Sequence, residues 1–169
     1  IGKVAFLYCS GLTSIIVENG NSVYDSRENC NAIIVTATNA LIVGCKNTII
    51  PNSVTSIGRD VFRNCDGLTS VIIPNSVTSI GKSAFEDCSG LKEIYVKAKT
   101  PPTVESDAFH NVPTASATLY VPIGTKAAYQ AAYGWNNFGN IIENDFNSFK
   151  ADGIFYNITD AVNKTVEVT

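Results

Sequence analysis

The sequence predicts a solenoid of the α/β class, mainly β, in which short repeats stack on one another. Two near-identical copies of one motif begin at Ile57 and Ile80, which are 23 residues apart. A unit this short cannot bury its own apolar side chains, so it must stack on its neighbours to build a core. Further copies begin near Ile1, Gly44 and Val104, which gives about five repeats in all.

Each repeat is predicted to contain a short strand. Apolar residues alternate in the second half of the stretch from Leu68 to Ile73, and Pro74, which cannot donate to a strand ladder, ends it. Strands of adjacent repeats should then pair into a parallel sheet. The segment from Gly81 to Cys88 is expected to form a short helical turn on the opposite, convex wall. The side chains expected to point inward, with their repeat equivalents, are Leu68, Val71, Ile73, Val77, Ile80, Phe85 and Cys88.

The repeat resembles the BspA-like class of bacterial leucine-rich repeats. Its motif reads approximately Ile-Gly-x-x-Ala-Phe-x-x-Cys-x-x-Leu-x-x-Val-x-Ile-Pro-x-Ser-Val-Thr, and residues 44–96 match it nearly throughout, while 1–17 match its first part. The resemblance implies a leucine-rich-repeat right-handed superhelix in a secreted or surface-exposed bacterial protein. Residues 119–125 look like the start of that family's C-terminal cap. The aromatic residues expected to seal the end of the core there are Tyr129, Tyr133, Trp135 and Phe138.

These patterns divide the chain into two parts. Residues 1–145 are predicted to be the solenoid, and 146–169 a linker with the truncated start of a further β module. Within the first part, residues 18–43 interrupt the repeat and should carry a β-hairpin, because two apolar runs flank the short polar turn 37–40; residues 119–145 form the cap. The absence of Met, and a start partway through a repeat, lead us to expect an internal piece of a longer protein.

Composition narrows the classes of partner. A net charge of −3 gives no clustered positive charge of the kind that nucleic acid requires. No apolar run approaches the roughly 20 residues of a membrane-spanning helix. Together with the resemblance, this predicts an extracellular or cell-surface location and no nucleic-acid partner.

The sequence predicts no enzyme, cofactor or metal site. The single histidine, His110, occupies the repeat slot of Arg63 and Glu86 and is expected to face solvent. The acidic residues are scattered singly, without a calcium loop or a carboxylate pair for glycoside hydrolysis. Examples of these single acidic residues are Asp25, Glu28, Glu105 and Asp107.

The five cysteines fall into two groups. Cys9, Cys65 and Cys88 share one column of the repeat, where free, buried thiols are expected. Cys30 and Cys45 lie outside that column, and the sequence leaves open whether they bridge the insert to the repeats.

A column of apolar and aromatic residues is predicted on the outward side of the strand ladder. Such exposed stripes often mark interaction sites, although β-branched residues on a ladder also pack against one another without any partner. In the insert, Tyr24, Arg27 and Glu28 are either part of a ligand site or part of a structural module. The candidate ligand-binding residues are Ile16, Ile49, Ile72, Tyr95 and Tyr120, with Ser70 and Glu93 as polar neighbours.

The function predicted from these features is non-catalytic binding outside the cell. The strand-ladder face would hold a protein or glycan in cell adhesion or host-factor binding. The alternative is an architectural spacer within a larger surface protein, without a ligand of its own. Self-association end to end is a further expectation, because terminal strands offer unpaired backbone groups.

Overall fold

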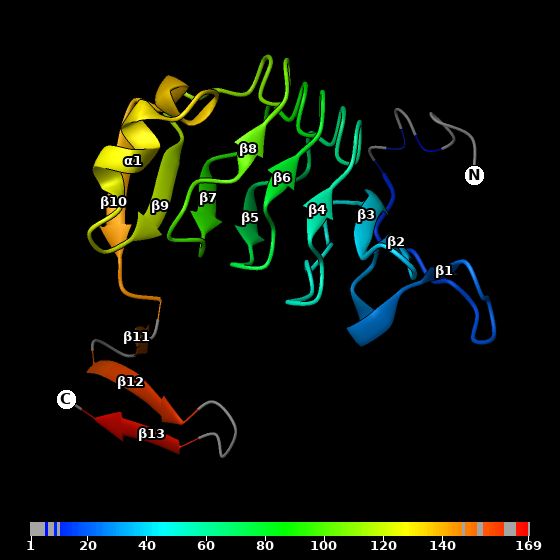
Figure 1. The fold of residues 1–169 in the computed structure, drawn as a ribbon, viewed down its shortest axis with the longest axis horizontal. Helices are drawn as coiled ribbons and strands as arrows, with labels where there is room; N and C mark the ends of the chain where they lie inside the picture. The colour runs from blue at the N-terminus through cyan, green and yellow to red at the C-terminus, as the bar shows by residue number, and fades with distance from the viewer. Residues whose placement is uncertain are drawn as a thin grey trace.

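The computed structural model describes residues 6, 9, 11–146, 148–151, 154–160 and 165–168. Its strands form three sheets, two of which run side by side along the stacked repeats (Figure 1). The fold is therefore mainly β and repetitive, as the sequence predicts.

The predicted strand of the repeat is present and pairs as expected. The register places Ile72 beside Tyr95, and Tyr95 beside Tyr120, so equivalent residues of consecutive repeats lie next to one another. All pairings in this four-stranded sheet are parallel. Its strands are β5 (Ser70–Ile73), β7 (Glu93–Val96), β9 (Thr118–Pro122) and β10 (Asn140–Asn144).

A second parallel ladder, which sequence reasoning missed, follows the turn after each proline. Ile57 pairs with Ile80, and Ile80 pairs with Val104. The last repeat is one residue longer than the 23-residue repeat before it, and the pairing shows that this residue is accommodated between the strands. The side chains of Ile57 and Ile80 are buried. The strands of this ladder are β4 (Ser56–Ile57), β6 (Ser79–Ile80) and β8 (Thr103–Val104).

The convex segment is not the helical turn that the sequence predicts. Every second backbone N–H group bonds to the next repeat: Phe62 N donates to Ala84 O at 2.8 Å, and Phe85 N donates to Ala108 O at 2.8 Å. The N–H groups between them make local turn bonds, such as Glu86 N to Ser83 O at 3.2 Å. Asp87, whose φ of 60° is in the left-handed region, also donates to the next repeat, and left-handed residues of this kind prevent a continuous helix. The segment therefore forms a third ladder between repeats, made of turns.

Stacked aromatic rings form the centre of the core. The rings of Phe62 and Phe85 lie 5.1 Å apart at 11°, and those of Phe85 and Phe109 lie 5.4 Å apart at 8°. Every inward residue named above from Leu68 to Cys88 is buried, which confirms that part of the prediction. In the first copy, however, Phe6 and Cys9 are exposed, so the prediction of inward equivalents is wrong for these two residues, while Ile15 is buried as predicted.

The insert contains the predicted hairpin and joins it to the repeats. Strands β2 and β3 pair antiparallel, and β3 continues parallel to β4. Gly44, directly after β3, lies against the ring of Phe62; a Cβ there would come within 2.7 Å of Phe62 Cζ, so only glycine fits without a shift. The elements of the insert are β1 (Tyr24–Asp25), η1 (Arg27–Asn29), β2 (Ile33–Val35) and β3 (Ala40–Val43).

Helix α1 (Lys126–Ala131) and η2 (Trp135–Asn137) cover the end of the aromatic column. The Tyr129 hydroxyl donates to Ala98 O at 2.6 Å, and Trp135 Nε1 donates to Pro102 O at 2.8 Å, so both buried rings have their polar atoms satisfied. Phe138 packs edge-on against Phe109. Tyr133 differs from the expectation, because 68% of it is exposed.

The remaining strands form a sheet of their own. β11 (Ser148–Ala151), β12 (Ile154–Asp160) and β13 (Thr165–Val168) pair antiparallel in the order β11-β12-β13. This sheet begins just after β10, where the parallel sheet ends.

All four buried cysteines and the exposed Cys9 carry free thiols, so no bridge joins Cys30 to Cys45 in this structure. Burial raises the pKa of Cys65 to about 11 and that of Cys88 to about 12, because a thiolate in an apolar core loses its hydration. The buried cysteines therefore act as small core residues.

Candidate binding surface on the strand ladder

The outward side chains of β5, β7, β9 and β10, together with the adjoining segment 45–50, make up a surface that we call the ladder face. Side chains alternate across a strand, so with Val71 and Ile73 buried, Ile72 must point outward. Ile72 is 53% exposed, and Ile49 is 72% exposed. The ladder face therefore presents large apolar side chains to water.

Two tyrosines form the middle of the ladder face. The rings of Tyr95 and Tyr120 stack 4.5 Å apart at 6°, and each is half-buried. The register puts Ile72 beyond Tyr95, and Ile142 beyond Tyr120. One face of each ring is thus covered by the other ring, and the opposite face is directed along the column toward an isoleucine. Only the ring edges and hydroxyl groups are left for a partner.

The Tyr95 hydroxyl keeps its proton at any physiological pH. Burial, followed by the negative charge of Glu93, raises the pKa of Tyr95 to about 12. Its O–H is already engaged within the ladder face, because the side chains of Glu93 and Tyr120 are its hydrogen-bond partners.

A row of polar residues runs beside the apolar column. Ser70, Glu93, Thr118 and Asn140 are paired in register, one from each strand. Asn140 Nδ2 donates to Thr118 Oγ1 at 2.8 Å. The predicted neighbours Ser70 and Glu93 therefore do lie side by side, next to Ile72 and Tyr95.

At the edge beyond β5 the ladder face is hollowed into an open groove of about 440 Å³. Ile49 and Ile72 lie along it, and Lys46 and Lys97 flank them. One acidic side chain, Glu28 of the insert, also lines the groove. The groove therefore combines exposed apolar side chains with a local excess of positive charge.

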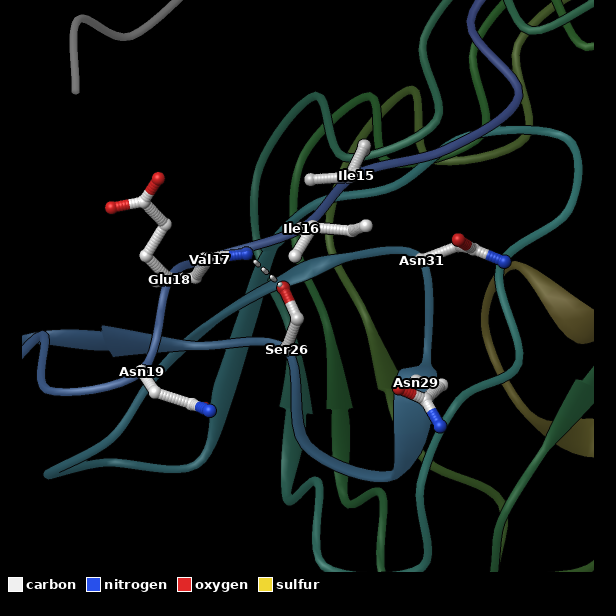
Figure 2. Close-up of a pocket in the computed structure, with 8 residues that line it drawn as sticks. All are labelled: Ile15, Ile16, Val17, Glu18, Asn19, Ser26, Asn29 and Asn31. Atoms are coloured by element: carbon white, nitrogen blue, oxygen red, sulfur yellow. Dashed lines mark hydrogen bonds between the residues drawn. The ribbon is translucent and has the colours of Figure 1, made fainter.

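The structure brings together four of the five predicted stripe residues. Ile72, Tyr95 and Tyr120 occupy one paired column, and Ile49 shares the groove with Ile72. Ile16 is 80% exposed but lies in a separate hollow beside the insert, where Val17 N donates to Ser26 Oγ at 3.0 Å (Figure 2). Within the described residues, no strand pairing places Ile16 in the column.

Some residues on or beside the ladder face were missed from the sequence, among them one isoleucine and two lysines. Ile142 belongs to β10, in a segment interpreted only as a cap; its signal was the alternation of buried Ile141 with exposed Ile142. Lys46 and Lys97 come from different repeats and occupy different repeat positions, so no column of the motif relates them.

The insert residues considered as a ligand site have mostly structural contacts. Arg27 forms an ion pair of 2.6 Å with Asp25 and donates to Asn39 Oδ1 at 2.8 Å. The hydrogen bond from Arg27 is the main cause that lowers the pKa of Asp25 to about 2. These contacts tie the start of the insert to its hairpin, which favours the structural module over the ligand site.

The described residues contain no group of three or more His, Cys, Asp or Glu side chains placed to hold a metal ion. His110 faces solvent as predicted, and its Nδ1 lies 3.9 Å from Glu86 Oε1. In the same part of the chain, no helix has the length and apolar character needed to cross a bilayer.

Comparison with known families shows to which family the repeat belongs. Residues 1–137 match the family described as "BspA type leucine rich repeat region", in 6 copies. The chain belongs to this family. The BspA-type repeats therefore outnumber the roughly five found by inspection of the motif.

Among solved structures, this BspA-type chain is similar to a leucine-rich cell surface protein from Faecalibacterium prausnitzii A2-165. The TM-score is 0.38 and the sequence identity 15%, over 91% of this chain and 60% of the other. This chain thus spans less than two thirds of that protein. No curated protein matches the sequence.

Proposed function

We propose that this BspA-type chain is a non-catalytic extracellular binding module, located at the cell surface, that holds a protein partner on the ladder face in an adhesive role. The observation that carries the proposal is the paired column of Ile72, Tyr95, Tyr120 and Ile142. This column exposes apolar surface to water, and a partner that buried it would be stabilised on the ladder face. Membership of the BspA-type family supports the location.

The geometry of the tyrosines favours a polypeptide over a glycan at this surface. Sugars are bound by the open faces of aromatic rings, and the faces of Tyr95 and Tyr120 are directed at each other and along the column. Ring edges with hydroxyl oxygens, beside exposed isoleucines, suit apolar side chains and backbone N–H groups. Lys46 and Lys97 then favour a segment that also carries acidic residues.

The test replaces two residues that are about equally exposed. Ile72→Asp places a charge in the centre of the ladder face, whereas Val23→Asp does so in the insert; Ile72 is 53% exposed and Val23 52%. Host extracellular proteins captured by the wild-type chain are measured against both variants by surface plasmon resonance. We expect Ile72→Asp to weaken binding at least tenfold and Val23→Asp to leave it unchanged. Equal binding by all three chains would refute the ladder face as the site.

The alternative role is that of an architectural spacer without a ligand. The separate antiparallel sheet β11-β12-β13 favours it, because a further module after the repeats is what a spacer would connect. Absence of any captured protein, with the fold intact, would favour the spacer.

For the wider architecture, we infer a right-handed solenoid over 1–145, with residues 18–43 as its insert and 119–145 as its cap, followed by a second module in 146–169. The support is that the last parallel strand, β10, ends at Asn144 and the new sheet begins at Ser148. The outer edge of β10, the last strand of the parallel sheet, is a place for end-to-end self-association, which light scattering over a range of concentrations would detect.

A further inference from the structure

A second, smaller pocket lies away from the ladder face, where the convex segment of the last repeat meets the turn before η2. Tyr133 stands over it, and 68% of this residue is exposed, although the neighbouring aromatic residues Tyr129 and Trp135 are buried. Gly134 explains the difference. Its φ of +80° and its close contact with Val104 turn the chain inward, so Trp135 enters the core while Tyr133 stays outside.

The pocket has a volume of about 220 Å³ and is open to solvent. Its polar lining comes from two elements that are far apart in the sequence. Glu105, Asp107 and His110 belong to the last repeat, while Tyr133 and Asn137 belong to the segment around η2. The pocket therefore exists only when the segment around η2 is packed on the last repeat.

Much of the hydrogen-bonding capacity around the pocket is unused. One carboxylate oxygen of Glu105 accepts a hydrogen bond from Lys82 N at 2.9 Å, and one oxygen of Asp107 lies 3.6 Å from Lys82 Nζ. The second oxygen of each carboxylate is left to accept a hydrogen bond from a ligand. Within the described part of the chain, no side-chain hydrogen bond involves the Tyr133 hydroxyl or the Asn137 amide. His110 directs Nδ1 toward Glu86, so its other ring nitrogen, Nε2, is left for a ligand.

We propose that this pocket binds a single unit of a neutral saccharide. A sugar ring offers a C–H face and several hydroxyl groups that both donate and accept hydrogen bonds. The pocket offers the C–H face the exposed ring of Tyr133, on which no other described ring stacks, and offers the hydroxyl groups the carboxylate, amide and imidazole groups of its lining. This proposal does not rest on the function of the ladder face, where the rings of Tyr95 and Tyr120 stack on each other.

Charge narrows the class of sugar. Glu105 and Asp107 make the pocket acidic at neutral pH, and Lys82 is already engaged by Asp107. An anionic sugar such as a sialic acid would be repelled, since like charges within a few ångströms disfavour binding. The site therefore selects neutral hexoses and N-acetylhexosamines.

The probes are the methyl glycosides of galactose, mannose and N-acetylglucosamine, with N-acetylneuraminic acid as the anionic comparator. Binding to the full chain is followed by saturation-transfer NMR and titration. We expect at least one neutral glycoside to bind in the millimolar range, as befits a shallow, open site, and the anionic sugar to show no transfer. Silence of all three neutral glycosides, or equal transfer to the anionic sugar, would overturn the proposal.

Variants locate the binding. Tyr133→Ala should weaken the neutral glycoside at least tenfold, and Asn137→Ala should weaken it severalfold, whereas Ile72→Asp on the ladder face should have no effect. Both pocket residues are exposed, so folding should persist, and unchanged emission of the single tryptophan, Trp135, verifies it. Wild-type affinity in Tyr133→Ala would place the sugar elsewhere and refute the site.

Discussion

Replacing Phe85 with alanine tests the stacked column at its centre. Phe85 is fully buried, with one ring stacked on each side, at 5.1 Å and 5.4 Å. Removing a buried phenylalanine costs about 3–5 kcal/mol, so a loss of about 4 kcal/mol in the free energy of unfolding is expected. Among the described residues Phe62 has one stacked ring neighbour, so Phe62→Ala should cost about 1 kcal/mol less.

Urea unfolding, followed by circular dichroism and by the emission of Trp135, measures these losses. The double variant Phe62→Ala/Phe85→Ala should show a coupling of about 0.5–1.5 kcal/mol, as expected for two rings in contact. Tyr133→Ala is the control, because an exposed aromatic residue should change stability by no more than about 0.5 kcal/mol. A loss below about 1 kcal/mol for Phe85→Ala, or strictly additive effects in the double variant, would contradict the stacking.

Three further outcomes are expected. Gly44→Ala should cost about 1–3 kcal/mol in urea unfolding because its Cβ meets the Phe62 ring, and adding Phe62→Leu should recover part of the loss; an unchanged midpoint would show that the ring moves freely. The pKa of Asp25 is about 2 when folded, below the ordinary 3.8, so its ion pair stabilises the fold above pH 4 and is lost as the pH falls toward 2; Asp25→Asn should remove about 1–2 kcal/mol of acid-dependent stability, and an identical pH profile would contradict this. In the native chain a thiol reagent should titrate the exposed Cys9 but not the buried Cys88 until denaturant is added, and rapid labelling of Cys88 would show that the core opens.

The parts of the fold that were predictable depend on repetition. Phe62 and Phe85 occupy the same slot of two copies, and the identity of the slot was enough to predict that both point inward, where the structure stacks their rings. Ile72 and Tyr95 were assigned to the ladder face for the same reason, since a strand of four residues shows its alternation clearly.

Features that depend on contacts between repeats were not visible in the sequence. Strands as short as Ser56–Ile57 are too brief to show a period, so the second ladder left no signal. The stretch around Phe85 was expected to be helical because all its N–H groups were assumed to bond locally, whereas every second one bonds to the next repeat. Tyr133 was assigned to the cap by its residue type alone, although the turn at Gly134 keeps it outside.

The third ladder, in which Phe62 bonds to Ala84 as Phe85 bonds to Ala108, has a consequence for how the chain can change in length. Each repeat receives from one neighbour the same set of donors and acceptors that it offers to the other. Duplicating residues 57–79 in the gene would therefore create no mismatched junction, and it would widen the outward wall by one strand spacing of about 4.8 Å. Proteins of this construction can adjust the reach of their surface in unit steps, without redesigning either end.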